Sequence, residues 1–117
     1  MKTNIIKEKS FDFALRIVKL YQFLVNDKKE FVLSKQLLRS GTSVGASVRE
    51  SEHAESKADF IHKLSIALKE ANETDYWIEL LFRSEYLAEN EYNSLKNDID
   101  ELLKILVSIL KTSKANK

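Results

Sequence analysis

Apolar residues recur along this chain at intervals of three and four positions, which is the spacing of one face of an α-helix. The pattern predicts four helices, at about residues 10–26, 34–54, 57–86 and 90–111. Short links separate them, near residues 27–33, 55–57 and 87–90. Because short links between long helices favour antiparallel neighbours, we expect an all-α fold, an antiparallel up-down-up-down four-helix bundle. The expected single domain spans residues 1–117, with residues 1–9 and 112–117 as disordered ends.

The expected helices carry signals at their starts and along their buried faces. Ser34 is a favourable N-cap residue for the second helix. Ser56 and Asp59 have the spacing of a capping box at the start of the third helix. On the fourth helix, alternating intervals of four and three predict a heptad seam made of Leu95, Ile99, Leu102, Leu106 and Ile109.

The first helix carries two apolar faces. One consists of Phe11, Ala14, Leu15, Val18, Gln22 and Val25, and the other of Phe13, Ile17, Leu20 and Leu24. Together they offer more apolar surface than one contact within a bundle covers. A large exposed apolar face indicates an interaction site. We therefore assign a subunit interface to four residues, three on this helix and one on the third: Phe13, Leu20, Leu24 and Trp77.

Both glycines of the chain, Gly41 and Gly45, lie in the expected second helix within the stretch RSGTSVGASVRE. A glycine inside a helix costs about 1 kcal/mol relative to alanine. Because the two are four residues apart, they share one helix face, where we expect another helix to approach closely. A phosphate-binding glycine loop is excluded, since no strand precedes the pair and no glycine-rich phosphate motif is present.

The composition narrows the class of protein further. The chain has no cysteine, which excludes disulfides, thiolate metal sites and a cysteine nucleophile. Its first residues lack the apolar run of a signal peptide. No apolar run approaches the roughly 18 residues that a membrane span requires. We therefore expect a soluble, cytoplasmic protein.

Charge is unevenly distributed along the chain, although the formal net charge is only +1. Residues 1–49 carry ten Lys or Arg against four acids, whereas residues 50–101 carry five against fourteen. The basic part can meet a polyanion or the acidic part of another copy, with an unevenly charged solvated surface as the alternative. The candidate nucleic-acid contacts on the first two helices are Arg16, Lys19, Lys35, Arg39 and Arg49.

Two short motifs pair a carboxylate with a histidine three residues later, Glu50 with His53 and Asp59 with His62. Carboxylate-bridged di-metal bundles use this spacing. We favour surface histidines, because both lie away from the apolar stripes and Asp59 is the expected capping-box acid. No serine has a visible base-orienting partner. The expected protein is therefore not an enzyme and has no metal, cofactor or small-molecule substrate.

A pattern of residues in the second and third helices is characteristic of a family. It comprises Gln36, Leu37, Arg39, Ser40, Ser43, Glu50 and residues 66–71. With these residues, the stretch from Lys35 to Leu81 resembles the bacterial four-helix-bundle family of 23S rRNA intervening-sequence proteins, and it is similar to the accessory variability proteins of diversity-generating retroelements. The family often has asparagine where this chain has Ser47.

That resemblance implies a homopentameric ring of bundles, and its retroelement relatives are basic rings that bind nucleic acid and a reverse transcriptase. Two functions of different classes stay open. The first is a non-catalytic oligomeric helical scaffold that contacts RNA or a ribonucleoprotein through a basic surface. The alternative is a protein–protein interaction ring with no nucleic-acid role. A metal-dependent enzyme using His53 and His62 is the least favoured.

Overall fold

Four helices make up almost the whole of residues 2–116, the part of the chain that this computed structural model describes, with side chains described for residues 4–116. The helices α1 to α4 span Lys2–Asn26, Leu33–Ser51, Lys57–Arg83 and Glu89–Ala115. No β-strand occurs among the described residues. The prediction of an all-helical chain with four helices is therefore confirmed. Within the same residues, no helix is both long enough and apolar enough to span a lipid bilayer.

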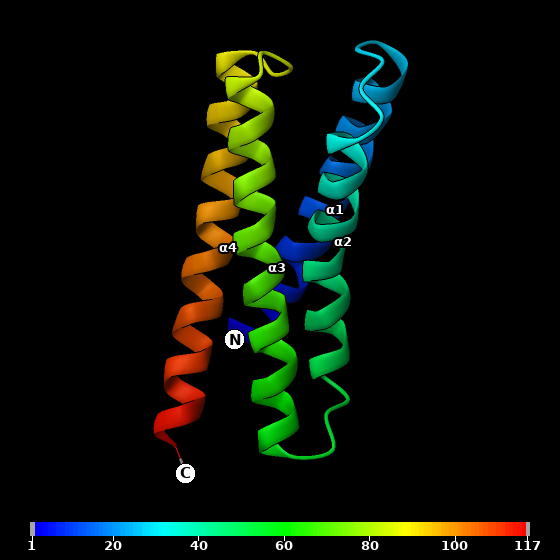
Figure 1. Cartoon of the computed structure of the whole chain (residues 1–117). Helices are drawn as coiled ribbons and strands as arrows, with labels where there is room; N and C mark the ends of the chain where they lie inside the picture. The colour runs from blue at the N-terminus through cyan, green and yellow to red at the C-terminus, as the bar shows by residue number, and fades with distance from the viewer. Residues whose placement is uncertain (1, 117) are drawn as a thin grey trace.

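The helices pack around one core, and each contacts two neighbours (Figure 1). α1 contacts α2 and α4, and α3 also contacts α2 and α4. The diagonal pairs, α1 with α3 and α2 with α4, have no Cα atoms within 8 Å of each other in the described part of the chain. Along the ribbon the chain reverses direction at each link, and the molecule measures 48 × 22 × 19 Å. The α1–α2 pair thus forms one side of the molecule and the α3–α4 pair the other.

The core is apolar and all four helices contribute to it. The five residues of the predicted heptad seam in α4 are all buried, as expected. Burying one leucine or isoleucine side chain contributes about 1.5–3 kcal/mol, so these contacts dominate the stability of the fold. The largest fully buried side chains are Ile6, Ile17, Leu24, Leu37, Val44, Leu64, Ile78, Leu81, Leu95, Ile99, Leu102 and Leu106.

One of the two apolar faces of α1 is buried in the core, and the other is exposed to solvent. Phe13, Leu20 and Leu24 are 3%, 5% and 0% exposed and belong to the chain's own core. Their assignment to a subunit interface is therefore wrong. Both faces have the same helical period. The face that is buried also includes Ile17, which lies against Gly41 of α2. The face that includes Phe11 and Leu15 is the one left exposed.

Both ends of the chain are more helical than predicted. α1 begins at Lys2, about two turns earlier than expected. Ile6 is 1% exposed and anchors these first turns to the core. α4 continues to Ala115. The ends expected to be disordered are therefore helical over residues 2–9 and 112–115, while the first and last residues of the chain lie outside the described part.

The interior helix ends also differ from the prediction. α2 ends at Ser51 and α3 at Arg83, three residues earlier than expected in both cases. At the start of α3, Ser56 is confirmed as the N-cap, because its hydroxyl accepts a hydrogen bond from the backbone N–H of Asp59 at 3.0 Å, whereas the Asp59 carboxylate accepts from the backbone N–H of Glu55 instead of that of Ser56. The helix therefore begins where its sequence signal lies.

α2 is capped by Glu30 rather than by Ser34. The Glu30 carboxylate accepts hydrogen bonds from the backbone N–H groups of Val32, Leu33 and Ser34 at 3.2, 3.0 and 2.6 Å. The Ser34 hydroxyl lies inside the helix and donates to the Glu30 carbonyl oxygen at 2.7 Å. Burial opposes ionisation of Glu30, but these hydrogen bonds outweigh it and lower its pKa. The carboxylate therefore satisfies amides that α2 leaves without helical partners.

The glycines of α2 lie where α1 passes closest. A Cβ atom at Gly41 would lie 2.9 Å from Cγ1 of Ile17, and one at Gly45 would lie 3.2 Å from the backbone oxygen of Ser10. Real Cβ atoms do not approach neighbours as closely as the first distance. The expectation that the glycines admit a neighbouring helix is therefore confirmed, and that helix is α1.

Replacing Gly41 with alanine is expected to destabilise the chain. The substitution gains about 1 kcal/mol of helix propensity, but overpacking against the buried Ile17 costs about 1–3 kcal/mol. We expect a net loss of about 1 kcal/mol in the free energy of unfolding, measured by urea denaturation. Gln36→Ala on the exposed side of α2 is the control and should change stability little. A Gly41→Ala variant more stable than the wild type would contradict the close approach.

Candidate functional site

A line of exposed apolar side chains runs along the outer face of α1. Phe11 is 48% exposed, Leu15 51% and Val18 37%. They are four and three residues apart and therefore lie on one face of the helix. The guanidinium of Arg49, on α2, lies 5.4 Å from the centroid of the Phe11 ring, a cation–π contact. Phe11, Leu15 and Val18 are called the α1 stripe below.

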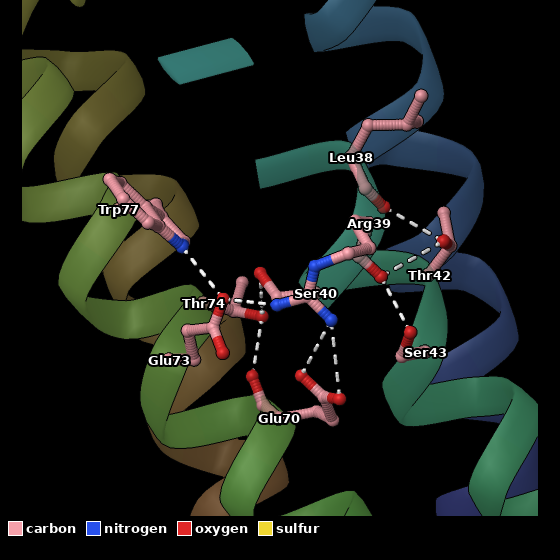
Figure 2. Close-up of polar contacts among 9 residues, drawn as sticks. All are labelled: Leu38, Arg39, Ser40, Thr42, Ser43, Glu70, Glu73, Thr74 and Trp77. Atoms are coloured by element: carbon pink, nitrogen blue, oxygen red, sulfur yellow. Dashed lines mark hydrogen bonds and ion pairs between the residues drawn. The ribbon is translucent and has the colours of Figure 1, made fainter. Parts of the chain in front are cut away.

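A polar seam joins α2 to α3 and centres on Arg39, as Figure 2 shows. The Arg39 guanidinium lies 3.4 Å from the Glu70 carboxylate and also hydrogen-bonds to Glu73. Trp77 donates its indole N–H to the same Glu73 oxygen at 3.0 Å. Glu73 is therefore held between an arginine of α2 and a tryptophan one turn further along α3. These four residues are called the α2–α3 seam.

Two hydroxyl groups lie in the core beside this seam. Ser40 and Thr74 are both 0% exposed. The Thr74 Oγ1 atom lies 3.0 Å from the Ser40 Oγ atom and 2.7 Å from the Glu70 carbonyl oxygen. Buried hydroxyls need such partners, because an unpaired one costs free energy. The Arg39-Ser40 pair of the family pattern thus contacts α3 through both of its side chains.

Next to the seam, α3 exposes an aromatic side chain. Tyr76 is 59% exposed, and its ring meets that of Trp77 edge-on, with centroids 4.9 Å apart. Trp77 is partly buried against the core. Tyr76 and Trp77 are called the α3 aromatic pair. The assignment of Trp77 to a subunit interface, made from the sequence, stays a prediction.

The charges of the seam stabilise one another. The hydrogen bond from Trp77, followed by that from Arg39, lowers the pKa of Glu73 against the opposing effect of burial. The hydrogen bond to Glu73 raises the pKa of Arg39. A lowered carboxyl pKa contributes stability above the unfolded-state pKa and loses it as the pH falls through the folded-state value. The seam is therefore expected to weaken only in acid.

The five predicted nucleic-acid contacts do not gather on one surface. Arg16 pairs with two carboxylates of α4, at 2.8 and 3.4 Å. Arg39 belongs to the α2–α3 seam, and Arg49 covers an aromatic ring of the α1 stripe. Lys19 and Lys35 form no ion pair with any residue in the described range. Three of the five cations thus already have partners within the chain.

Positive charge without an acidic partner does occur where α1 and α2 join. Within residues 2–116, no ion pair involves the four lysines of this end, Lys19, Lys28, Lys29 and Lys35. Sequence reasoning missed Lys28 and Lys29, although both fall in a predicted link. Lys19 and Lys28 line a groove of ≈ 730 Å³ between α1 and the α3–α4 link, with Phe23 and Tyr86 also in its lining. We call the four lysines the lysine end.

The two carboxylate–histidine motifs are not gathered into a cluster of metal ligands among the described residues. Glu50 pairs with Lys63 at 3.2 Å. Asp59 accepts the backbone N–H of Glu55 at 3.2 Å as part of the α3 cap. His62 is exposed on α3, and no group of three or more potential metal ligands occurs among the described residues. Both carboxylates therefore have structural partners.

Fold and surface together define a four-helix protein whose distinguishing features are an exposed apolar helix face and a clamped α2–α3 seam. The chain belongs to the family of 23S rRNA-intervening sequence proteins, whose sequence model matches residues 2–108. The resemblance to the 23S rRNA intervening-sequence proteins is thereby confirmed, while the similarity to the retroelement accessory proteins stays a prediction.

A crystal structure of a protein of unknown function from the S23 ribosomal protein family of Bacteroides thetaiotaomicron is similar to this chain. The two are 63% identical, with a TM-score of 0.94. The match covers 95% of this chain and 99% of the other. No curated protein sequence matches the chain.

Removing the charge of Arg39 is expected to raise the pH at which Glu73 titrates. Trp77 is the only tryptophan, and its indole bonds to the Glu73 carboxylate, so its fluorescence reports protonation of that group. We expect the acid midpoint of Trp77 emission to lie below the ordinary carboxyl pKa of 4.5 in the wild type. Arg39→Met should move it upward.

Lys69→Met is the control for this titration, because Lys69 acts on Glu73 only through a weaker, longer-range charge interaction. It should move the midpoint less than Arg39→Met. An unchanged midpoint in Arg39→Met would show that the guanidinium does not hold Glu73 in solution.

Proposed function

We propose that this chain is a non-catalytic helical scaffold that assembles with copies of itself through the α1 stripe. The single observation that carries the proposal is the exposure of three large apolar side chains, 37% to 51%, in one line on an ordered helix. Contiguous apolar surface of this kind marks association sites in soluble proteins. A homopentameric ring is the assembly that the family resemblance suggests.

The surroundings of the α1 stripe suit a protein contact. Its first and last residues are seven positions apart, about 10 Å along the helix axis. Arg49 adds a cationic group with an apolar stem over Phe11, and arginine and aromatic residues are enriched at interfaces. The stripe lies on a helix fixed by the core and by the glycine contact with α2, so little ordering is needed when a partner binds.

Placing a carboxylate in the stripe is expected to break the assembly. In Val18→Glu, association would bury an unpaired charge, at a cost of about 3 kcal/mol or more, which lowers affinity about 100-fold or more. Light scattering on a sizing column should give several chains for the wild type, over a range of dilutions, and one chain for the variant.

Val107→Glu is the matched control, because Val107 is also a helical valine and is 38% exposed, against 37% for Val18. It lies on α4, away from the stripe, and should keep the wild-type mass. Equal effects of the two substitutions, or a wild type with the mass of one chain at every concentration, would contradict the proposal.

Contact with RNA is a second candidate function, favoured by the lysine end. Its four lysines have no acidic partner in the described chain, so their charge is available to phosphates. An oligomer would repeat this end in every copy and add the contacts together. The name of the family, which refers to 23S rRNA, makes RNA the first polyanion to test.

Binding of a fluorescent single-stranded RNA, followed by anisotropy, is expected to weaken steeply as salt rises. Removing one lysine from the RNA-binding surface should reduce the slope of log affinity against log salt by about 0.7. Lys19→Glu and Lys35→Glu should therefore bind more weakly and depend less on salt. Lys104→Glu, an exposed lysine on α4, is the control. Equal RNA binding by all variants, or no RNA binding by the wild type at low salt, would contradict RNA contact through the lysine end. The scaffold would then bind protein alone.

A further inference from the structure

Two apolar patches lie on the two flanks of α2. On one flank, Arg49 of α2 covers Phe11 of the α1 stripe. On the other, Arg39 of α2 holds Glu73, which accepts the indole N–H of Trp77 in the α3 aromatic pair. α1 and α3 both pack against α2, and within the described chain their backbones stay apart, with no Cα atom of one within 8 Å of a Cα atom of the other. The two patches are therefore separate, and one molecule can use both at the same time.

Assembly that uses one face and assembly that uses two have different consequences. An isologous contact joins the same patch of two copies and stops at a dimer. A heterologous contact joins two different patches, and it closes into a ring or continues as a filament. A chain with two separate apolar patches has the surface that the second mode requires.

The charge of the two sides favours the heterologous contact. α1 carries five Lys or Arg against two acids. α3 carries four Lys or Arg against five acids. Contact between the α1 stripes of two copies would bring two basic sides together. Contact between the stripe of one copy and α3 of another would bring opposite charges together and favour association.

We propose that the α1 stripe of one copy docks on the α3 aromatic pair of the next copy, in a head-to-tail contact. This inference rests on the self-assembly proposed above and assigns the second face of the interface. Tyr76, which is 59% exposed, supplies aromatic area for the stripe, and the edge of Trp77 extends that surface. In the resulting assembly, the outer surface of α2 lies between successive interfaces.

A mixing experiment tests this contact. Leu15→Glu disrupts the α1 stripe and leaves the α3 aromatic pair, called the α3 face in this test, intact. Tyr76→Glu disrupts the α3 face and leaves the α1 stripe intact. Both residues are more than half exposed, so neither change disturbs the core, and circular dichroism checks folding. Each variant alone should have the mass of one chain. An equimolar mixture should give a complex of one copy of each, seen by native mass spectrometry, because one intact stripe meets one intact α3 face.

Phe31→Glu is the matched control for Tyr76→Glu, since Phe31 is an aromatic residue with 58% exposure in the α1–α2 link. It should assemble like the wild type. If the wild type assembles and Leu15→Glu does not, but Tyr76→Glu keeps the wild-type mass, self-assembly stands and the α3 face is overturned. The α3 face is also overturned if the mixture forms no one-to-one complex. A wild type of one chain overturns both proposals.

Discussion

A helix in a four-helix bundle can bury only one face, and α1 carries two apolar faces. The core takes the face with Phe13 and Leu24, which closes the bundle and leaves the α1 stripe in solvent. Most of the proposed function depends on this constraint. In a single chain the stripe leaves apolar surface in water, and the proposed function assigns a second copy of the chain to cover it.

α2 fixes the positions of α1 and α3, and with them the α1 stripe and the α3 aromatic pair. Gly41 and Gly45 let α1 approach until Ile17 and the Ser10 backbone fill the space of two side chains. The same approach places Arg49 over Phe11. On its other flank, α2 is fixed to α3 by the Arg39 network and by the buried Ser40–Thr74 contact. Both proposed interfaces are therefore positioned by one helix, whose outer surface separates them.

Much of the fold could be predicted from helical periodicity, because apolar residues recur every three to four positions along the buried face of each of the four helices. The start of α2 was predicted to within one residue, but its capping residue was not, since the cap is Glu30, four residues before the serine that fits the usual capping pattern. The buried face of α1 could not be chosen either, because both faces have the same period. The sequence could not show that Arg39, assigned as a nucleic-acid contact from its charge, pairs with a carboxylate of the same chain. Its partner Glu73 is 34 residues away and lies close to it only in the folded chain.

Coverage of the α1 stripe by another copy in solution can be measured directly. Hydroxyl-radical footprinting compares two phenylalanines in one sample, Phe11 at 48% exposure and Phe31 at 58%. If copies associate through the stripe, oxidation of Phe11 slows as protein concentration rises, while oxidation of Phe31 stays constant. Oxidation of Phe11 at a constant rate over the whole concentration range would contradict association through the stripe.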